Sequence, residues 1–171
     1  MHDHGPLGRL ALTNEAIGAP SRPFFVLLEH RGVVVIDSKL GLNEIVLVRG
    51  LPGSGKTTIA KKMKGYIHLE ADMFFEVNGI YVYDYLKIKE AHDWCVSKAK
   101  LELEQGNNVV VSNTFIKLFE LKRYIDFQYP FRIIEAQGKY PNLHGVPQEK
   151  IEAMRSKWEK LPRGWENGSV R

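Results

Sequence analysis

Residues 45–64 read IVLVRGLPGSGKTTIAKKMK, a short apolar run that leads through a glycine-rich turn into a more polar stretch. An uninterrupted apolar run of this length is typical of a strand buried on both faces of a parallel sheet. Beyond the turn, Ile59, Ala60 and Met63 recur at helical spacing, which predicts a helix to about Lys64. A buried strand joined to a helix by a tight turn is typical of α/β folds.

The turn itself matches the phosphate-loop pattern G-x-x-x-x-G-K-[ST] at every fixed position. Glycines let the backbone curl so that N–H groups point inward as an anion-binding nest, and the following helix adds the positive end of its dipole. Lys56 can reach the β- and γ-phosphates, and the Thr57 hydroxyl can hold Mg²⁺. The alternative is a glycine-rich turn that only joins a strand to a helix. We therefore predict an ATP and Mg²⁺ site formed by Gly50, Pro52, Gly53, Ser54, Gly55, Lys56, Thr57 and Thr58.

Short apolar runs and helical patterns continue to alternate downstream. The longest helix, expected over 86–105, has a buried stripe that includes Ala91, Cys95 and Ala99, and Cys95 is interpreted as a structural thiol. Further strands are expected over 66–69, 109–111 and 132–136, and further helices over 118–125 and 147–161. This alternation predicts an α/β fold with a mostly parallel sheet flanked by helices. The phosphate-loop motif makes this a fold of the P-loop NTPase type.

The chain before residue 44 has a different composition. Residues 1–23 are rich in glycine, proline and small polar residues, which predicts an arm or an extended lead-in. Residues 24–38 read FFVLLEHRGVVVIDS, two β-rich runs around a turn, which predicts a β-hairpin extension. We expect three parts: an arm and hairpin over 1–43, one α/β domain over 44–161 and a tail over 162–171.

The composition is that of a globular protein, since 44% of the 171 residues are hydrophobic and 26% are charged. The single cysteine rules out an internal disulfide and fits a reducing compartment. No apolar run approaches the roughly 20 residues of a membrane-spanning helix, and residues 1–20 lack a signal-peptide pattern. We expect a cytoplasmic protein, in the host cytoplasm if a phage encodes it. The net charge of +4 is too small to predict nucleic-acid binding from electrostatics alone.

Asp72 lies just beyond the strand expected over 66–69. At the edge where the strands end, its carboxylate can face the γ-phosphate and accept the proton of an attacking hydroxyl. The alternative is a helix N-cap, because aspartate is a favourable capping residue before Met73. The local sequence leaves both open. Glu70 and Glu76 are weaker candidates, since such carboxylates are usually solvated.

Ser112-Asn113-Thr114 follow the next expected strand, where P-loop proteins often carry an aspartate linked to Mg²⁺. This chain has no aspartate there. Asn113 and Thr114 can orient water, metal or a phosphate oxygen, or they can form a turn through side-chain hydrogen bonds. His92, in the longest helix, is interpreted as a surface or partly buried residue.

Five segments carry a resemblance to a known family: GLPGSGKTT, LEADMFF, EAHDW, VVVSNT and LHGVPQEKI. Together they resemble the P-loop kinase domain of polynucleotide 5′-hydroxyl kinases, as carried by certain animal ubiquitin-ligase-binding proteins and by many phage and bacterial proteins. The resemblance covers about residues 44–160. It implies that Asp72 is the general base, that Lys56 and Thr57 serve the phosphates and Mg²⁺, and that Asn113-Thr114 match the family's Asp/Asn-Thr pair.

The chain departs from the family pattern in two places. Phe115 stands where the family continues with asparagine, and no arginine-rich lid helix lies between Ala136 and His144. Lys139 or Arg155 can substitute, although lysine lacks the planar fork that clamps a γ-phosphate. We expect a phosphotransferase that moves the γ-phosphate of ATP to a hydroxyl of a nucleic acid, nucleoside or related small molecule. The alternative is a catalytically weak ATP-binding module that contacts a protein partner through its N-terminal region.

Overall fold

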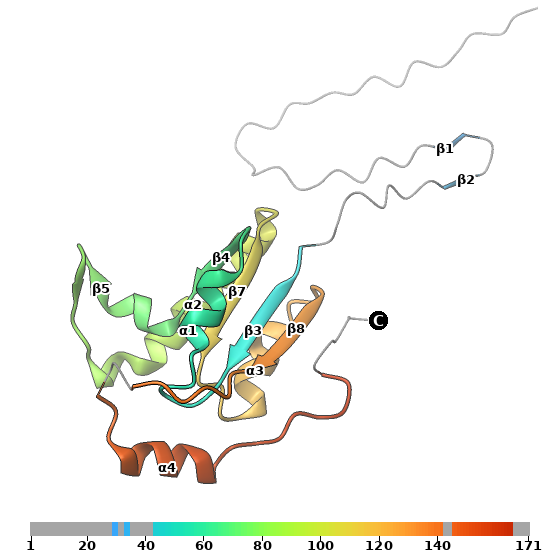
Figure 1. Cartoon of the computed structure of the whole chain (residues 1–171). Coiled ribbons are helices and arrows are strands. Elements are labelled where there is room, and N and C mark those ends of the chain that lie inside the picture. The colour runs from blue at the N-terminus through green and yellow to red at the C-terminus, as the bar shows by residue number, and fades with distance from the viewer. Residues whose placement is uncertain (1–28, 31–32, 35–42, 142–144, 166–171) are drawn as a thin grey trace, which may run out of the picture.

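The computed structural model describes residues 29–30, 33–34, 43–141 and 145–165 (Figure 1). Near the N-terminus, β1 (Glu29–His30) and β2 (Val33–Val34) pair as antiparallel strands. This pairing confirms the centre of the hairpin predicted over 24–38. The remainder of that hairpin and the arm predicted over 1–23 lie outside the described residues.

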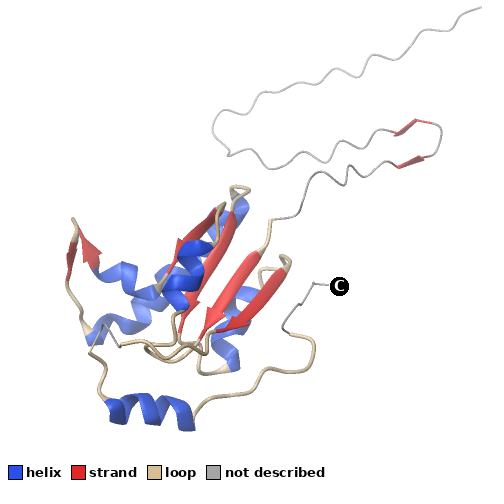
Figure 2. Ribbon diagram, viewed as in Figure 1, coloured by secondary structure: helices blue, strands red, loops and turns tan. Residues whose placement is uncertain are grey.

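A parallel sheet forms the centre of the main body (Figure 2). Its strands are β3 (Ile45–Arg49), β4 (Tyr66–Leu69), β7 (Asn108–Asn113) and β8 (Phe131–Glu135), in the order β4-β7-β3-β8. All neighbouring strands run parallel, so the residues that follow β3, β4 and β7 meet at one edge of the sheet. The predicted α/β fold is therefore confirmed.

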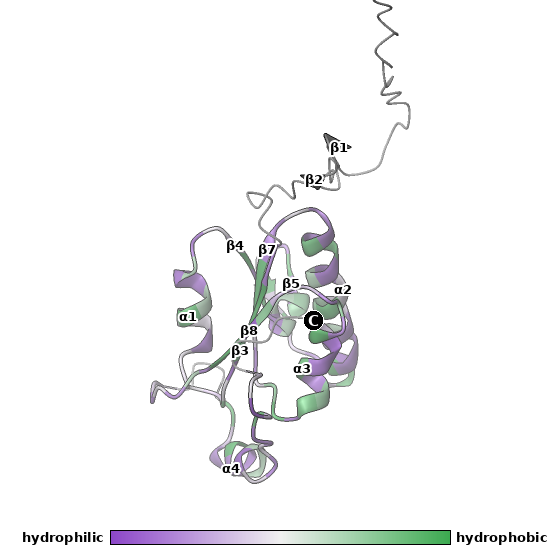
Figure 3. Cartoon of the chain, turned by 90° about the vertical axis from the view of Figure 1, so that its right-hand side faces the viewer, coloured by the Kyte–Doolittle hydropathy of each residue, from purple (hydrophilic) through white to green (hydrophobic). Residues whose placement is uncertain are grey.

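Helices cover both faces of this sheet (Figure 3). One face is covered by α1 (Lys56–Lys62), and the other by α2 (Ile88–Glu104) and α3 (Leu118–Ile125). The larger core lies on the α2–α3 side, and Cys95 is fully buried in it, as predicted. The smaller core lies on the α1 side and consists of Val46, Val48, Ala60, Val110 and Ala136. No helix within the described ranges is both long and apolar enough to cross a membrane.

Between β4 and α2 the chain forms a projection that the sequence pattern did not predict (Figure 1). A 3₁₀ helix, η1 (Ala71–Phe75), follows β4, and then β5 (Glu76–Val77) and β6 (Ile80–Tyr81) form a small hairpin. A second 3₁₀ turn, η2 (Tyr85–Lys87), leads into α2, which begins two residues later than predicted. Strands as short as these give no periodicity for a sequence pattern to detect.

The last helix, α4 (Gln148–Ser156), is shorter than the helix predicted over 147–161. Beyond it, Glu159 is held in a non-helical conformation by contacts on both of its main-chain groups. Its N–H donates to the Ile116 carbonyl at 3.0 Å, and its own carbonyl accepts from Arg49 Nη2 at 3.0 Å. Trp158 packs inward as predicted, but from this non-helical segment, with its ring over the Arg49 guanidinium. The predicted helix end was wrong because these long-range contacts replace the helical hydrogen bonds.

Candidate active site

The glycine-rich turn between β3 and α1 has the backbone of an anion-binding loop. Gly53 and Gly55 have φ angles of 77° and 88°, in the left-handed region that favours glycine. A Cβ at Gly50 would lie 2.3 Å from Oγ of Ser54, so the close packing of the turn also requires glycine there. The first N–H groups of α1 have no acceptor within the helix, and the N-cap, Gly55, provides no side-chain cap, so these groups are available to an anion. The turn is therefore shaped to receive phosphate oxygens.

The segment after β8 braces this loop from outside. The N–H of Gly138 donates to the Ser54 carbonyl at 3.1 Å, and the N–H of Tyr140 donates to the Gly53 carbonyl at 2.8 Å. The Tyr140 ring lies against Gly55, where an added Cβ would approach it to 2.8 Å. The short segment that stands in place of a longer lid thus packs directly on the phosphate loop.

The side chain of Lys56 folds back over the loop, where Nζ donates to the Leu51 carbonyl at 3.1 Å. Burial lowers the pKa of Lys56, and the negative charges of Glu70 and Asp72 oppose part of this shift. The ammonium therefore lies between the loop and two carboxylates, a position from which it can contact bound phosphate.

A cavity of about 280 Å³ opens beside the loop, where the ends of β3, β4 and β7 meet. It brings together Lys56, Thr57 and Asp72, which the sequence identifies as the reactive set, and Asn113-Thr114 also line it. His92 lines it from α2, a position near the site that the sequence did not predict. Gly50 and Ser54 shape the turn without lining the cavity. The four other residues of the predicted phosphate site complete this part of the wall: Pro52, Gly53, Gly55 and Thr58.

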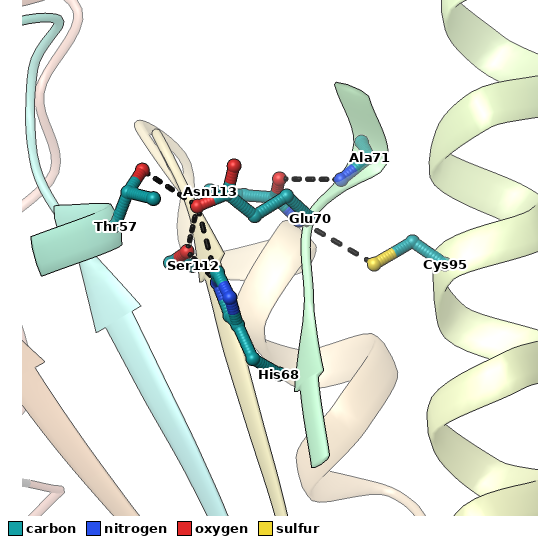
Figure 4. A network of polar contacts seen from close by, with 7 residues as sticks. All are labelled: Thr57, His68, Glu70, Ala71, Cys95, Ser112 and Asn113. Atoms are coloured by element: carbon teal, nitrogen blue, oxygen red, sulfur yellow. Dashed lines mark hydrogen bonds and ion pairs between the residues drawn. The ribbon is translucent and has the colours of Figure 1, made fainter. Parts of the chain in front are cut away.

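Asp72 lies in the first turn of η1, and the N-cap position is occupied by Glu70. The alternative interpretation of Asp72 as a helix cap is therefore wrong. Burial lowers the pKa of Lys56 and raises that of Tyr81, and the Asp72 carboxylate lies close enough to oppose the first shift and add to the second. The start of η1 is fixed by Asn113, whose side-chain oxygen accepts a hydrogen bond from the Ala71 N–H at 3.0 Å (Figure 4).

Glu70 is not the solvated carboxylate that the sequence predicted. Its side chain is only 15% exposed, and Oε1 accepts a hydrogen bond from the Thr57 hydroxyl at 2.6 Å (Figure 4). The Ser112 hydroxyl also donates to this oxygen, and His68 Nε2 lies 3.1 Å from it. Burial raises the pKa of Glu70, but the hydrogen bonds from His68, Ser112 and Thr57 outweigh burial and bring the pKa to about 2. The carboxylate is therefore ionised at neutral pH, in direct contact with the phosphate-loop threonine.

A second cavity, of about 790 Å³, lies between the phosphate loop, the segment after β8 and α4. Lys139 and Arg155, the two predicted substitutes for a lid arginine, both line it, together with Trp158 and Ser54. They do not line the cavity that contains Asp72. The two cations therefore line a different cavity from Lys56, Thr57 and Asp72, although the two cavities share Pro52, Gly53 and Tyr140.

The β5–β6 hairpin and the residues after it expose an aromatic surface. Tyr81 is 48% exposed and Tyr83 is 55% exposed, and the buried ring of Phe75 contacts both, at centroid distances of 6.3 and 5.2 Å. Exposed apolar groups that gather in one segment can form a binding surface. The other exposed apolar residues here are Val77, Ile80, Val82, Tyr85 and Leu86.

Arg49, which sequence reasoning missed, is the last residue of β3 and is fully buried. Besides its contacts with Trp158 and Glu159, it lies 3.4 Å from a carboxylate oxygen of Glu135, and burial lowers its pKa. The available signal was a single charge at the end of an otherwise apolar strand, immediately before Gly50. Arg49 links the strand that carries the phosphate loop to the segment that follows α4.

The donors around Thr57 fit Mg²⁺, which takes oxygen ligands and is usually bound by one or two carboxylates together with substrate phosphates. The Thr57 hydroxyl and the Glu70 carboxylate supply such oxygens on the wall of one cavity. Within the described part of the chain, no group of three or more His, Cys, Asp or Glu side chains could hold a metal.

Residues 45–138, more than half of the chain, match a family described as an AAA domain. The chain is also 31% identical to NEDD4-binding protein 2 of Homo sapiens over 135 residues, which are 68% of this chain but only 8% of the human protein. The structure is similar to a chain of a Pnkp1/Rnl/Hen1 complex (TM-score 0.47, 17% identity, 76% of this chain and 44% of that one). It is also similar to a gluconokinase from Sinorhizobium meliloti 1021 (TM-score 0.46, 17% identity, 72% and 78%). These structural similarities are weak, and the match over residues 45–138 carries the family assignment.

Proposed function

Because the chain belongs to this AAA domain family of P-loop kinase-like domains, we propose that it is an ATP-dependent phosphotransferase. It moves the γ-phosphate of ATP to a hydroxyl group of a nucleic acid, a nucleoside or a related small molecule. The observation that carries this proposal is the cavity that combines Lys56, Thr57 and Asp72. One wall carries groups that bind phosphate, and another carries a carboxylate that can accept a proton.

ATP binds with its phosphates in the loop, where the N–H groups and Lys56 contact the phosphate oxygens. The Thr57 hydroxyl would hold Mg²⁺, which would supply positive charge to offset the negative charge of the transferring phosphate. The base and ribose occupy the larger cavity, where Lys139, Arg155 and Trp158 line the wall. A planar ring and two cations suit a nucleotide base and its ribose-phosphate.

The acceptor enters from the side of Asp72. Its hydroxyl gives a proton to the Asp72 carboxylate as its oxygen forms a bond to the γ-phosphorus, while the bond from the γ-phosphorus to the bridging oxygen breaks and ADP leaves. Tyr81 and Tyr83 support an acceptor with a planar base, because aromatic rings beside the site offer faces on which a nucleobase can stack.

An acceptor screen followed by the Asp72→Asn variant tests the proposal. ATP consumption is measured with 5′-hydroxyl oligonucleotides, nucleosides and simple sugars, and with buffer alone. For the acceptor found, we expect Asp72→Asn to lower single-turnover transfer by roughly 10²–10⁴-fold, the usual contribution of a general base. ATP affinity, measured by calorimetry, should stay near that of the parent. Asp126→Asn, an exposed carboxylate after α3, is the matched control.

Two results would contradict the proposal in different ways. Transfer at the parental rate in Asp72→Asn would remove the general-base assignment and leave the nucleotide site intact. A parent that binds ATP but phosphorylates none of the acceptors would instead favour the binding-module alternative.

A further inference from the structure

We infer that Glu70 supplies the carboxylate of the Mg²⁺ site, in the role that an aspartate at the end of the adjacent strand has in other P-loop proteins. This inference rests on the proposed nucleotide site. In those proteins the loop Ser or Thr and an aspartate hold the metal together. Here β7 ends in Ser112 and Asn113, neither of which carries a charge. Within the described residues, the carboxylate that contacts Thr57 comes from the end of β4 (Figure 4).

The register of the sheet explains how a residue from β4 reaches this position. Leu69 pairs with Val111 in the parallel ladder, so the next residues along, Glu70 and Ser112, emerge side by side at the carboxyl edge. The Ser112 hydroxyl donates to Glu70, so the glutamate lies beside the side chain that ends β7. Glutamate is one methylene longer than aspartate, and its oxygen reaches the Thr57 hydroxyl at 2.6 Å. The sheet therefore brings a carboxylate to the metal position from the neighbouring strand.

The contacts of Glu70 leave one carboxylate oxygen for a ligand. The interactions with Thr57, His68 and Ser112 all fall on Oε1, and Oε2 accepts no hydrogen bond from the described residues. The side chain lines the same cavity as Lys56 and is 15% exposed. Glu70 is thus held in place through one oxygen, while the other has no hydrogen-bond partner among the described residues.

The charges of the cavity also require a cation when nucleotide is bound. Lys56 supplies one positive charge, and Glu70 and Asp72 supply two negative charges before any phosphate enters. A triphosphate adds several more negative charges within hydrogen-bond distance of Lys56 and Thr57. Repulsion between these groups is strong in a partly desolvated cavity, and a divalent cation between Glu70 and the phosphates removes it.

The competing explanation is a purely structural role for Glu70, in which its carboxylate joins His68 and Ser112 and never contacts a metal. His68 Nε2 lies 2.8 Å from the Ser112 hydroxyl as well, so these two side chains remain in contact without Glu70. The two explanations differ in whether metal binding needs a negative charge at this edge of the sheet. They can be separated by moving the carboxylate from one strand to the other.

The experiment measures metal binding rather than phosphate transfer. Mn²⁺, used as the probe for Mg²⁺, is titrated by electron paramagnetic resonance into the full chain with a non-hydrolysable ATP analogue. Nucleotide affinity without metal is measured by calorimetry. The variants are Glu70→Gln, which removes the charge at nearly constant size, and the exchange Glu70→Ser with Ser112→Asp, which returns a carboxylate to the end of β7. Glu76→Gln, an exposed carboxylate on β5, is the control.

We expect Glu70→Gln to weaken Mn²⁺ binding by about 10–100-fold, with metal-free nucleotide affinity unchanged or higher, and the exchange variant to recover most of the loss. Parental Mn²⁺ affinity in Glu70→Gln would overturn the inference, and so would a loss that the exchange variant does not recover. If Glu70→Gln does not fold, the exchange variant still tests the inference. It can fold and bind Mn²⁺ with parental affinity only if a carboxylate at the end of β7 can replace the one at the end of β4. A parent that binds neither nucleotide nor Mn²⁺ refutes the proposed function as well, whereas a parent that binds both confines the failure to Glu70.

Discussion

Replacing Arg49 tests whether charge or packing holds the segment after α4 against the phosphate-loop strand. The guanidinium is fully buried, donates to the Glu159 carbonyl at 3.0 Å and lies 3.9 Å from the centroid of the Trp158 ring. Its Nε and Nη1 atoms have no hydrogen-bond partner among the described residues. Two variants separate the contributions. Arg49→Met keeps a long apolar stem without charge, and Arg49→Ala removes both stem and charge.

The expected magnitudes follow from these contacts. Losing a hydrogen bond from a charged donor costs about 1.5–3 kcal/mol, and losing a desolvated cation–π contact costs about 2 kcal/mol. Against these losses, methionine avoids the desolvation of a buried guanidinium, which costs several kcal/mol. This cost is poorly offset in Arg49, because Nε has no hydrogen-bond partner among the described residues and Nη1 has only the 3.4 Å ion pair with the partly exposed Glu135. The terms nearly cancel, so the free energy of unfolding of Arg49→Met should change by less than about 1.5 kcal/mol. Arg49→Ala also leaves a cavity and should cost about 2–5 kcal/mol.

The assay is urea denaturation of both variants and the parent, followed by tryptophan fluorescence and circular dichroism, with ATP affinity measured in parallel. Since α4 lines the larger cavity, Arg49→Ala should weaken ATP binding and Arg49→Met should preserve it. Equal destabilisation by the two substitutions would refute the reasoning, because the polar contacts of the guanidinium would then outweigh its packing.

Two further substitutions address the loop and the pH dependence of stability. Lys56→Ala should leave the unfolding free energy close to that of the parent, because among the described residues its ammonium makes one hydrogen bond, to the Leu51 carbonyl. ATP and Mg²⁺ should no longer raise the melting temperature of this variant, and an equal rise in variant and parent would contradict the phosphate-loop assignment. At the opposite edge of the sheet, hydrogen bonds from Arg132 at 2.7 and 3.0 Å lower the pKa of Glu44 below 4.5. Because the pKa of Glu44 is lower in the folded state than in the unfolded state, its ionised form stabilises the fold above about pH 4.5, and this stabilisation is lost as the pH falls. Glu44→Gln should therefore flatten the acid side of the curve of stability against pH. Urea midpoints of the variant that fall between about pH 7 and pH 3 as steeply as those of the parent would argue against this role.

The sequence predicted most of the sheet, because buried parallel strands are apolar runs and the phosphate loop fixes where one strand ends and one helix begins. It also placed Asp72 beside the loop, since position after a strand is enough to predict the edge of the sheet. Glu70 was misjudged because its environment depends on the β4–β7 register, which joins residues 42 positions apart. The end of α4 was misjudged for a similar reason, since the contact between Arg49 and Glu159 spans 110 positions. Local patterns contain neither pairing.

The strand order also explains how two carboxylates so close in sequence can have different roles. Glu70 and Asp72 both follow β4, but η1 begins between them, and Asn113 at the end of β7 holds the Ala71 N–H at this point. The turn directs Glu70 toward Thr57 and Ser112, whereas Asp72 continues around the cavity. One carboxylate is thereby fixed by hydrogen bonds and kept ionised, as the inferred metal role requires. The other lines the same cavity, where in the proposed mechanism it accepts the proton of the acceptor hydroxyl apart from the proposed metal site. In this arrangement β3 provides the phosphate loop, β4 provides both carboxylates, and β7 provides the neutral polar groups that hold them apart.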